Sequence, residues 1–215
     1  MTRMRTILQL CADTGSDTWA YRNDPRYEVI TVGADVGVEN YSPDRPIHGI
    51  IANPVCTEFS PARRGDTFGG GERKPADPES MLWMVDECIR IIEEAQPKWY
   101  AIENPATSTL WKYMEGDPLL RYEPWQYGSP WTKKTALWGE FTVPEVQYTD
   151  WDDVPKIQGL YARPGRKPSL AFMHKSAFFQ IPEFHESGMP VPDSDMEFRS
   201  LCSQKFALAF KTANP

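Results

Sequence analysis

Short apolar runs alternate with polar stretches through the first hundred residues of the chain. Such runs, bounded by turn residues, indicate strands, whereas apolar positions three and four residues apart indicate a helix. We expect strands at 6–10, 27–32, 48–52, 98–102, 123–127 and 135–141. A longer helix should cover 78–95. Asp77 can cap this helix, Pro78 suits its first position and Pro97 stops it.

The order of these elements predicts an α/β fold, with a Rossmann-like, open and mostly parallel sheet flanked by helices. Residues 1–141 are assigned to this core. Prolines are frequent and periodicity is weak in 142–195, so we expect a small loop-rich insertion there. Residues 196–215 form a C-terminal segment with a closing helix at 199–212. Ligands of such sheets lie beyond the carboxyl ends of the strands.

The composition limits the class of protein, its cellular compartment and the partners that it can bind. The 215 residues are 40% hydrophobic and 25% charged, as in an ordinary globular protein. No run approaches the ~18 apolar residues of a membrane span. The apolar run at 7–12 is too short for a signal peptide, so we expect a cytoplasmic protein without membrane contact. Because the net charge is −7, any nucleic-acid contact must come from a local basic face.

The cysteines lack the paired spacing of metal sites and small disulfide frameworks, so each is judged alone and no metal is expected. Cys88 lies on the apolar face of the predicted long helix. Cys11 and Cys202 lie in segments that are expected to pack side by side. We assign these three cysteines to packing, which leaves Cys56 as the candidate for chemistry.

Two neighbouring strand ends carry the most informative residues. Cys56 follows the strand at 48–52 and Glu103 follows the strand at 98–102, so both should lie at the same edge of the sheet. Taken alone, a single cysteine is usually a buried, inert thiol, and a carboxylate near a proline is usually part of a turn. Together the two suit attack on a pyrimidine ring. A thiolate adds to C6 while a carboxylic acid protonates or hydrogen-bonds N3.

Five segments that contain these residues occur in a specific order along the chain. They are LQLCADTGS, NPVCTEFSPARRG, AIENP, YGSPWTKKTALW and FRSLCSQKFALAFKTANP. With this ordered set the sequence resembles the cytosine-C5 DNA methyltransferases, particularly the short members found in phage genomes. The resemblance implies the class I S-adenosylmethionine-dependent methyltransferase fold, with the C-terminal segment packed back beside the first strand. It also implies residence in the cytoplasm of a bacterial host if the protein is phage-encoded.

The resemblance gives roles to individual residues. Cys56 is implied to be the nucleophile, Glu103 the group that engages N3, and Asn104 a support for that loop. Residues implied to lie near the base or the DNA backbone are Ser60, Arg63, Arg64, Lys133 and Lys134. The implied cofactor is S-adenosylmethionine. Residues implied to bind it are Leu10, Cys11, Ala12, Asp13, Thr14, Gly15, Asp35, Asn53 and Pro54.

The cofactor region departs from the family pattern. The first turn lacks the usual phenylalanine and first glycine, and the Pro-Pro-Cys motif has become Pro54-Val55-Cys56. Gly33 stands where an acidic residue would hold the ribose hydroxyls. Asp35 can replace that residue only if its loop shifts by two positions. We therefore expect weaker cofactor binding than is usual for the family.

Two other functions remain open from the sequence. The same thiol and carboxylate could lead to cytosine deamination, or to the use of a modified cofactor, and a non-catalytic descendant could still bind nucleic acid. The segment 142–195 is small for reading bases in a groove. The partner could therefore be DNA with a short site, single-stranded DNA or a free cytosine nucleotide.

Overall fold

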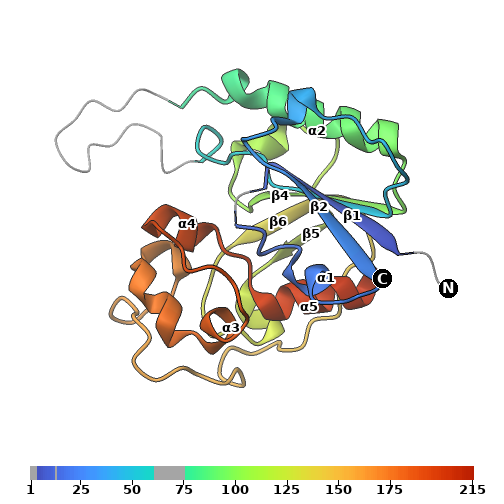
Figure 1. The fold of residues 1–215 in the computed structure, drawn as a ribbon. Helices are drawn as coiled ribbons and strands as arrows, with labels where there is room; N and C mark the ends of the chain where they lie inside the picture. The colour runs from blue at the N-terminus through green and yellow to red at the C-terminus, as the bar shows by residue number, and fades with distance from the viewer. Residues whose placement is uncertain (1–3, 13, 61–75) are drawn as a thin grey trace.

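The computed structural model describes residues 4–12, 14–60 and 76–215. Its centre is a six-stranded sheet with the order β2-β1-β3-β4-β6-β5 (Figure 1). The strands are β1 (Arg5–Leu10), β2 (Tyr27–Val32), β3 (Gly49–Ala52), β4 (Trp99–Pro105), β5 (Leu120–Tyr122) and β6 (Thr135–Glu140). The first four strands run parallel, whereas β6 runs antiparallel to both β4 and β5. The predicted Rossmann-like α/β fold is confirmed.

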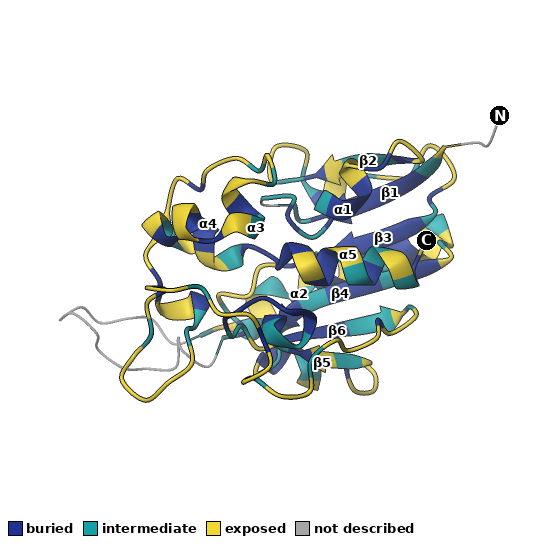
Figure 2. Ribbon diagram, turned by 90° about the horizontal axis from the view of Figure 1, so that it is seen from below, coloured by how far each residue is buried: buried dark blue, intermediate teal, exposed yellow. Residues whose placement is uncertain are grey.

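Helices cover both faces of the sheet (Figure 1). The α-helices are α1 (Trp19–Arg22), α2 (Leu82–Ala95), α3 (Pro182–His185), α4 (Asp195–Ser200) and α5 (Gln204–Ala213). Leu8 and Ile50 belong to the apolar cluster that includes Cys88 and Ile91 of α2. The adjacent residues Ile7 and Ile51 belong to the apolar cluster on the other face of the sheet, which also contains Phe206 and Phe210 of α5. Both faces of the central strands are therefore buried, as Figure 2 shows for β1 and β3, and this accounts for their largely apolar sequences.

Helix α2 matches the predicted helix except in its first turn. Residues Pro78–Met81 form a 3₁₀ turn, and the α-helix begins at Leu82. The side chain of Asp77 accepts a hydrogen bond from the Ser80 backbone N–H at 3.3 Å, as expected of a cap. Gln96 ends the helix in the left-handed conformation, with φ of 44°.

Cys88 is completely buried on the inner face of α2, and its Sγ lies 3.6 Å from Sγ of Cys11. Replacing Cys88 with alanine should lower the free energy of unfolding by ~1 kcal/mol, because a small buried group is removed from a packed core. Urea denaturation of both proteins measures this loss. An unchanged midpoint would contradict the packing role.

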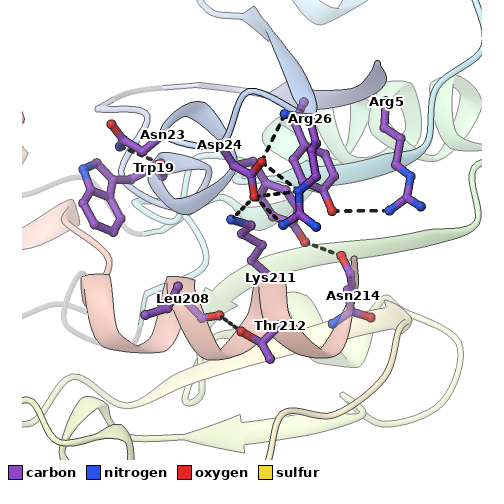
Figure 3. Close-up of polar contacts among 11 residues, drawn as sticks. Arg5, Trp19, Asn23, Asp24, Arg26, Leu208, Lys211, Thr212 and Asn214 are labelled. Carbon is purple, nitrogen blue, oxygen red and sulfur yellow. Dashed lines mark hydrogen bonds and ion pairs between the residues drawn. The ribbon is translucent and has the colours of Figure 1, made fainter. Parts of the chain in front are cut away.

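The C-terminal helix is fastened to the chain around α1 by polar contacts (Figure 3). The Tyr21 hydroxyl donates a hydrogen bond to the backbone oxygen of Asn214 at 2.8 Å. Asp24 forms ion pairs with Arg26 and with Lys211 of α5, and these hydrogen-bonded cations hold the pKa of the Asp24 carboxyl well below its usual range. The last residues of the chain therefore lie beside its first helix.

Two predicted elements are wrong. The strand expected at 123–127 is a 3₁₀ helix over Pro124–Tyr127, and the strand β5 lies just before it. Pro124 has no backbone N–H for a sheet, and Glu123 and Gln126 form a reciprocal capping box. The closing helix expected at 199–212 is divided, because α4 ends at Ser200 and Ser203 then caps α5.

The segment 142–195 is better packed than a loop-rich insertion would suggest. It contains the 3₁₀ helices Leu170–Phe172 and Lys175–Gln180 as well as α3. Its buried side chains share a cluster with Trp131, Phe198 and Leu201 from the flanking chain. Within the described ranges, no helix is long and apolar enough to cross a membrane.

Candidate active site

The loop that carries Cys56 is fastened by hydrogen bonds along its length. The backbone N–H of Asn53 donates to the oxygen of Leu10 at 3.1 Å. The Asn104 side chain then donates from Nδ2 to the oxygen of Pro54 at 2.9 Å. These bonds tie the loop after β3 to the ends of β1 and β4.

The far side of the same loop is anchored by Phe59. Its side chain is 1% exposed, and its backbone oxygen accepts hydrogen bonds from the Thr109 backbone N–H at 2.9 Å and from the Thr109 hydroxyl at 3.1 Å. Cys56 lies between these fixed points and is exposed as a residue. The loop therefore presents Cys56 outward from a held backbone.

A cluster of charged and polar side chains lies beside this loop. Asn53 donates from Nδ2 to Oε2 of Glu103 at 3.5 Å. The carboxylate of Asp17, from the turn after β1, accepts hydrogen bonds from Asn53 and from the thiol of Cys202. Lys133 supplies the positive charge that acts on both carboxyl groups.

Burial and mutual repulsion favour the protonated carboxyl groups in this cluster. Burial raises the pKa of Glu103 to about 7, with a further rise from the negative charge of Asp17, while Lys133 opposes the shift. Burial likewise raises the pKa of Asp17 against the opposing effect of Lys133. Two buried carboxyl groups that repel each other, with one nearby ammonium group, retain a proton near neutral pH.

The Cys56 thiol lies within electrostatic range of this cluster. Burial raises the pKa of the thiol, and the negative charge of Glu103 raises it further, whereas Lys133 lowers it. The structure thus brings the thiol and the Glu103 carboxyl to the same edge of the sheet, at the ends of β3 and β4. At neutral pH the resting pair holds a thiol rather than a thiolate.

The residues expected to hold the cofactor lie at the ends of β1 and β2. Leu10 is buried at the end of β1. Cys11 follows in the left-handed conformation with φ of 52°, and the Ala12 backbone N–H donates to the oxygen of Val32 at 3.1 Å. Thr14 donates to Ser16 at 2.8 Å within the turn. Gly15 adopts a φ of 71°, which its missing side chain permits.

Asp35 reaches back to the end of β2. A Cβ atom added to Gly33 would lie 3.0 Å from Oδ1 of Asp35 and 3.2 Å from the backbone oxygen of Ala12. Position 33 has no acidic side chain of its own, but the carboxylate of Asp35, two residues further along the chain, lies beside it. Two acceptor oxygens, from Asp35 and Ala12, thus lie close to the end of β2, and a side chain at position 33 would crowd them.

The expected substrate residues lie in different surroundings. Lys133 points inward and donates from Nζ to the backbone oxygens of Ser200 at 2.6 Å and Leu201 at 3.0 Å. This placement suits a charge partner of Glu103 rather than a phosphate contact. Lys134 is exposed, and Ser60 is half-buried at the end of the Cys56 loop. Asp13, Arg63 and Arg64 lie outside the described residues.

Asp17 and Cys202 are site residues that the sequence reasoning missed. Asp17 carried a detectable signal, since a carboxylate in the turn after the first strand lies at the ligand-binding edge of the sheet. The segment with Cys202 is expected from the sequence to pack beside the first turn, but Cys202 itself is assigned to packing and its interaction with Asp17 is not predicted. Among the described residues, no group of three or more metal-ligating side chains is placed to hold a metal ion.

Comparisons with known proteins agree with this geometry. No protein-family model matches the chain. A "Probable DNA (cytosine-5)-methyltransferase" of Frog virus 3 is 28% identical over 151 residues, which cover 61% of this chain and 69% of the viral protein.

A solved Escherichia coli structure, named as a DNA modification methyltransferase encoded within a prophage, superimposes with a TM-score of 0.51. The superposition covers 75% of this chain and 56% of that structure, at 16% sequence identity. This chain therefore spans just over half the length of its structural neighbour. At this identity the likeness shows the fold alone.

Proposed function

We propose that this chain, a member of the cytosine-C5 DNA methyltransferase family, transfers a methyl group from S-adenosylmethionine to C5 of cytosine in DNA through a covalent Cys56–C6 adduct. The viral relative supports the reaction class. The observation that carries the mechanism is the Cys56 thiol at the same edge of the sheet as the Glu103 carboxyl, close enough for the negative charge of Glu103 to act on the thiol.

In the proposed mechanism, the Cys56 thiolate forms a bond to C6 of cytosine, and the C5–C6 double bond becomes the electron pair that makes C5 nucleophilic. Protonated Glu103 donates its hydrogen to N3 and so stabilises the charge that develops on the ring. Asn104 holds the nucleophile loop through Pro54. The cofactor, when bound, supplies an electrophilic methyl group. Loss of the C5 proton to solvent, elimination of the thiolate from C6 and return of the N3 proton to Glu103 then restore the aromatic ring.

The residues at the ends of β1 and β2 fit the proposed cofactor. Cys11 and Gly15 give the turn after Leu10 a left-handed backbone, and Asp35 lies with a carboxylate oxygen beside Gly33. This position of Asp35 supports the sequence-based expectation that it can replace the missing acid at position 33. We assign Asp35 to the ribose hydroxyls.

Replacing Asp35 with asparagine should weaken binding of S-adenosylmethionine about tenfold or more, because a charge-assisted hydrogen bond contributes ~1.5–3 kcal/mol. Gly33→Ala should also weaken binding, since its Cβ would enter the space beside Asp35. Calorimetric titration measures both. Asp44→Asn is the matched control, because Asp44 is exposed and pairs with Arg45. Equal affinities for the parent and Asp35→Asn would remove Asp35 from the cofactor site.

Mass spectrometry of nucleosides tests the function directly. Single-stranded DNA, duplex DNA and deoxycytidine monophosphate are each incubated with the protein, with and without S-adenosylmethionine. Cofactor-dependent 5-methylcytosine in either DNA is the expected product. Deoxyuridine formed without cofactor would favour deamination, product only from the free nucleotide would change the substrate, and no product from any substrate would favour a non-catalytic binding protein.

A further inference from the structure

The segment 154–182 has a charge that contrasts with the rest of the protein. It contains Lys156, Arg163, Arg166, Lys167 and Lys175 and no aspartate or glutamate, in a chain whose net charge is −7. A local positive face of this kind attracts a polyanion even when the whole protein is acidic. The segment therefore carries the charge complementarity that a nucleic-acid strand requires.

The same segment contains a small pocket with aromatic walls, which we call the insertion pocket. Its floor is formed by the buried residues Met173 and Ala177, and its rim by Tyr161 and Phe172, which are 54% and 50% exposed. The pocket volume is about 270 Å³. This is just below the range of pockets for drug-sized ligands, so it suits a single planar ring rather than a whole cofactor.

A cation lies on one of these walls. The guanidinium carbon of Arg163 is 3.7 Å from the centroid of the Phe172 ring. The facing negative charge is Asp195, whose Oδ1 is 3.7 Å from Nε2 of His174 and accepts a hydrogen bond from the Lys175 backbone N–H. Exposed aromatic faces next to arginine are typical of sites that stack unpaired bases.

Short connections join the insertion pocket to the candidate active site. Ser169 pairs with Thr132, the residue before Lys133. Arg199 donates from Nε to the oxygen of Met173 at 3.2 Å, and the next residue, Ser200, accepts a hydrogen bond from Lys133. Figure 1 shows this part of the chain on the side where the parallel strands end. These contacts link the insertion pocket to the segment that carries Lys133.

We propose that the insertion pocket binds an unpaired base of single-stranded DNA, a neighbour of the reacting cytosine, by stacking it against Phe172 and Tyr161. This inference rests on the proposed function, because it assumes a DNA strand at Cys56. The unpaired state follows from geometry, since both faces of a base in a duplex are covered by its stacked neighbours. The pocket also compensates for the small segment available to read a groove.

The test measures binding of a fluorescent single-stranded oligonucleotide with one central cytosine. Phe172→Leu keeps an apolar side chain but removes the aromatic face, so affinity should fall about fivefold to a hundredfold. Phe179→Leu is the matched control, because Phe179 is 62% exposed in the same segment and does not line the pocket. Equal losses in the two variants would indicate a general apolar surface and overturn the proposal.

A second measurement identifies which nucleotide of the strand has its base in the insertion pocket. The oligonucleotide is prepared with an abasic site at each position in turn around the cytosine. The parent protein should lose affinity at one flanking position, and Phe172→Leu should show no further loss there. A flat scan for the parent, or equal sensitivity of fully duplex DNA to Phe172→Leu, would contradict an unpaired stacked base. If the stacking proposal fails, the methylation assay still tests the proposed function separately. The parent protein can form 5-methylcytosine whether or not a base binds in the insertion pocket.

Discussion

Replacing Cys56 with serine is expected to abolish formation of a covalent complex with DNA and to lower the rate of methyl transfer by at least ~10³-fold. The serine hydroxyl occupies the same loop position but is a far weaker nucleophile at neutral pH. DNA containing 5-fluorocytosine makes the adduct observable. Fluorine cannot leave C5 as a cation, so the thiolate is not eliminated and the complex survives denaturing electrophoresis.

Cys88→Ala is the control for this experiment. Cys88 is buried on α2 and is unconnected to the charged cluster, so the variant should trap DNA as the parent does for equal amounts of folded protein. A covalent complex formed in full yield by Cys56→Ser would show that a residue other than Cys56 is the nucleophile. Trapping lost equally in both variants would point to a folding defect instead.

The ionisation of Cys56 and Glu103 opposes what the proposed chemistry needs. The reaction uses a thiolate and a carboxylic acid, whereas the pKa of the Cys56 thiol is raised and that of Glu103 is about 7. The reactive combination is then the minor form of the singly deprotonated pair. Bound substrate can favour it, because N3 accepts the proton that Glu103 holds.

The sequence predicts well the strand ends that carry Cys56 and Glu103, because these ends depend on local signals. The apolar runs that end at Ala52 and Ile102 are buried on both sides, so their ends can be located from composition alone. Parallel strands end at one edge, which is enough to place Cys56 near Glu103 before any contact is known.

The rest of the site depends on contacts that no local pattern encodes. Cys202 meets Asp17 only because α5 packs against α1, and Lys133 turns inward because the carbonyls of Ser200 and Leu201 lie within its reach. The predicted strand at 123–127 failed for a related reason. Its apolar residues match a strand, but the proline and the capping box favour a turn.

Asp17→Asn is expected to change the pH dependence of kcat/KM. Asparagine keeps an oxygen that can accept the hydrogen bonds of Asn53 and Cys202, but it removes the negative charge that raises the pKa of Glu103. The pKa of Glu103 should then fall by about one unit. Lys133 lowers the pKa of Glu103 in both the parent and the variant, so the difference between them reports the charge of Asp17.

The direction of the change in the pH profile of kcat/KM follows from the protonation states of Cys56 and Glu103. The reactive pair carries one proton, so kcat/KM should rise with pH up to the first pKa, about 7, and stay level until the thiol pKa is reached. In Asp17→Asn the rising limb should move down by about one pH unit, and the plateau should fall about tenfold as the two pKa values separate. Glu103→Gln should abolish the rise near pH 7 and leave a rise only at the higher pKa of the Cys56 thiol, with slow turnover because no acid protonates N3.

Glu183→Gln provides the matched control for the rising limb. Burial also raises the pKa of Glu183, but this carboxyl accepts a hydrogen bond from the Ser129 hydroxyl and lies outside the cluster around Cys56. Its replacement should leave the rising limb at the parent pH. A purely structural role for Asp17 would lower kcat/KM by the same factor at every pH. A rising limb unchanged in Asp17→Asn would therefore show that the charge of Asp17 does not act on Glu103 during turnover.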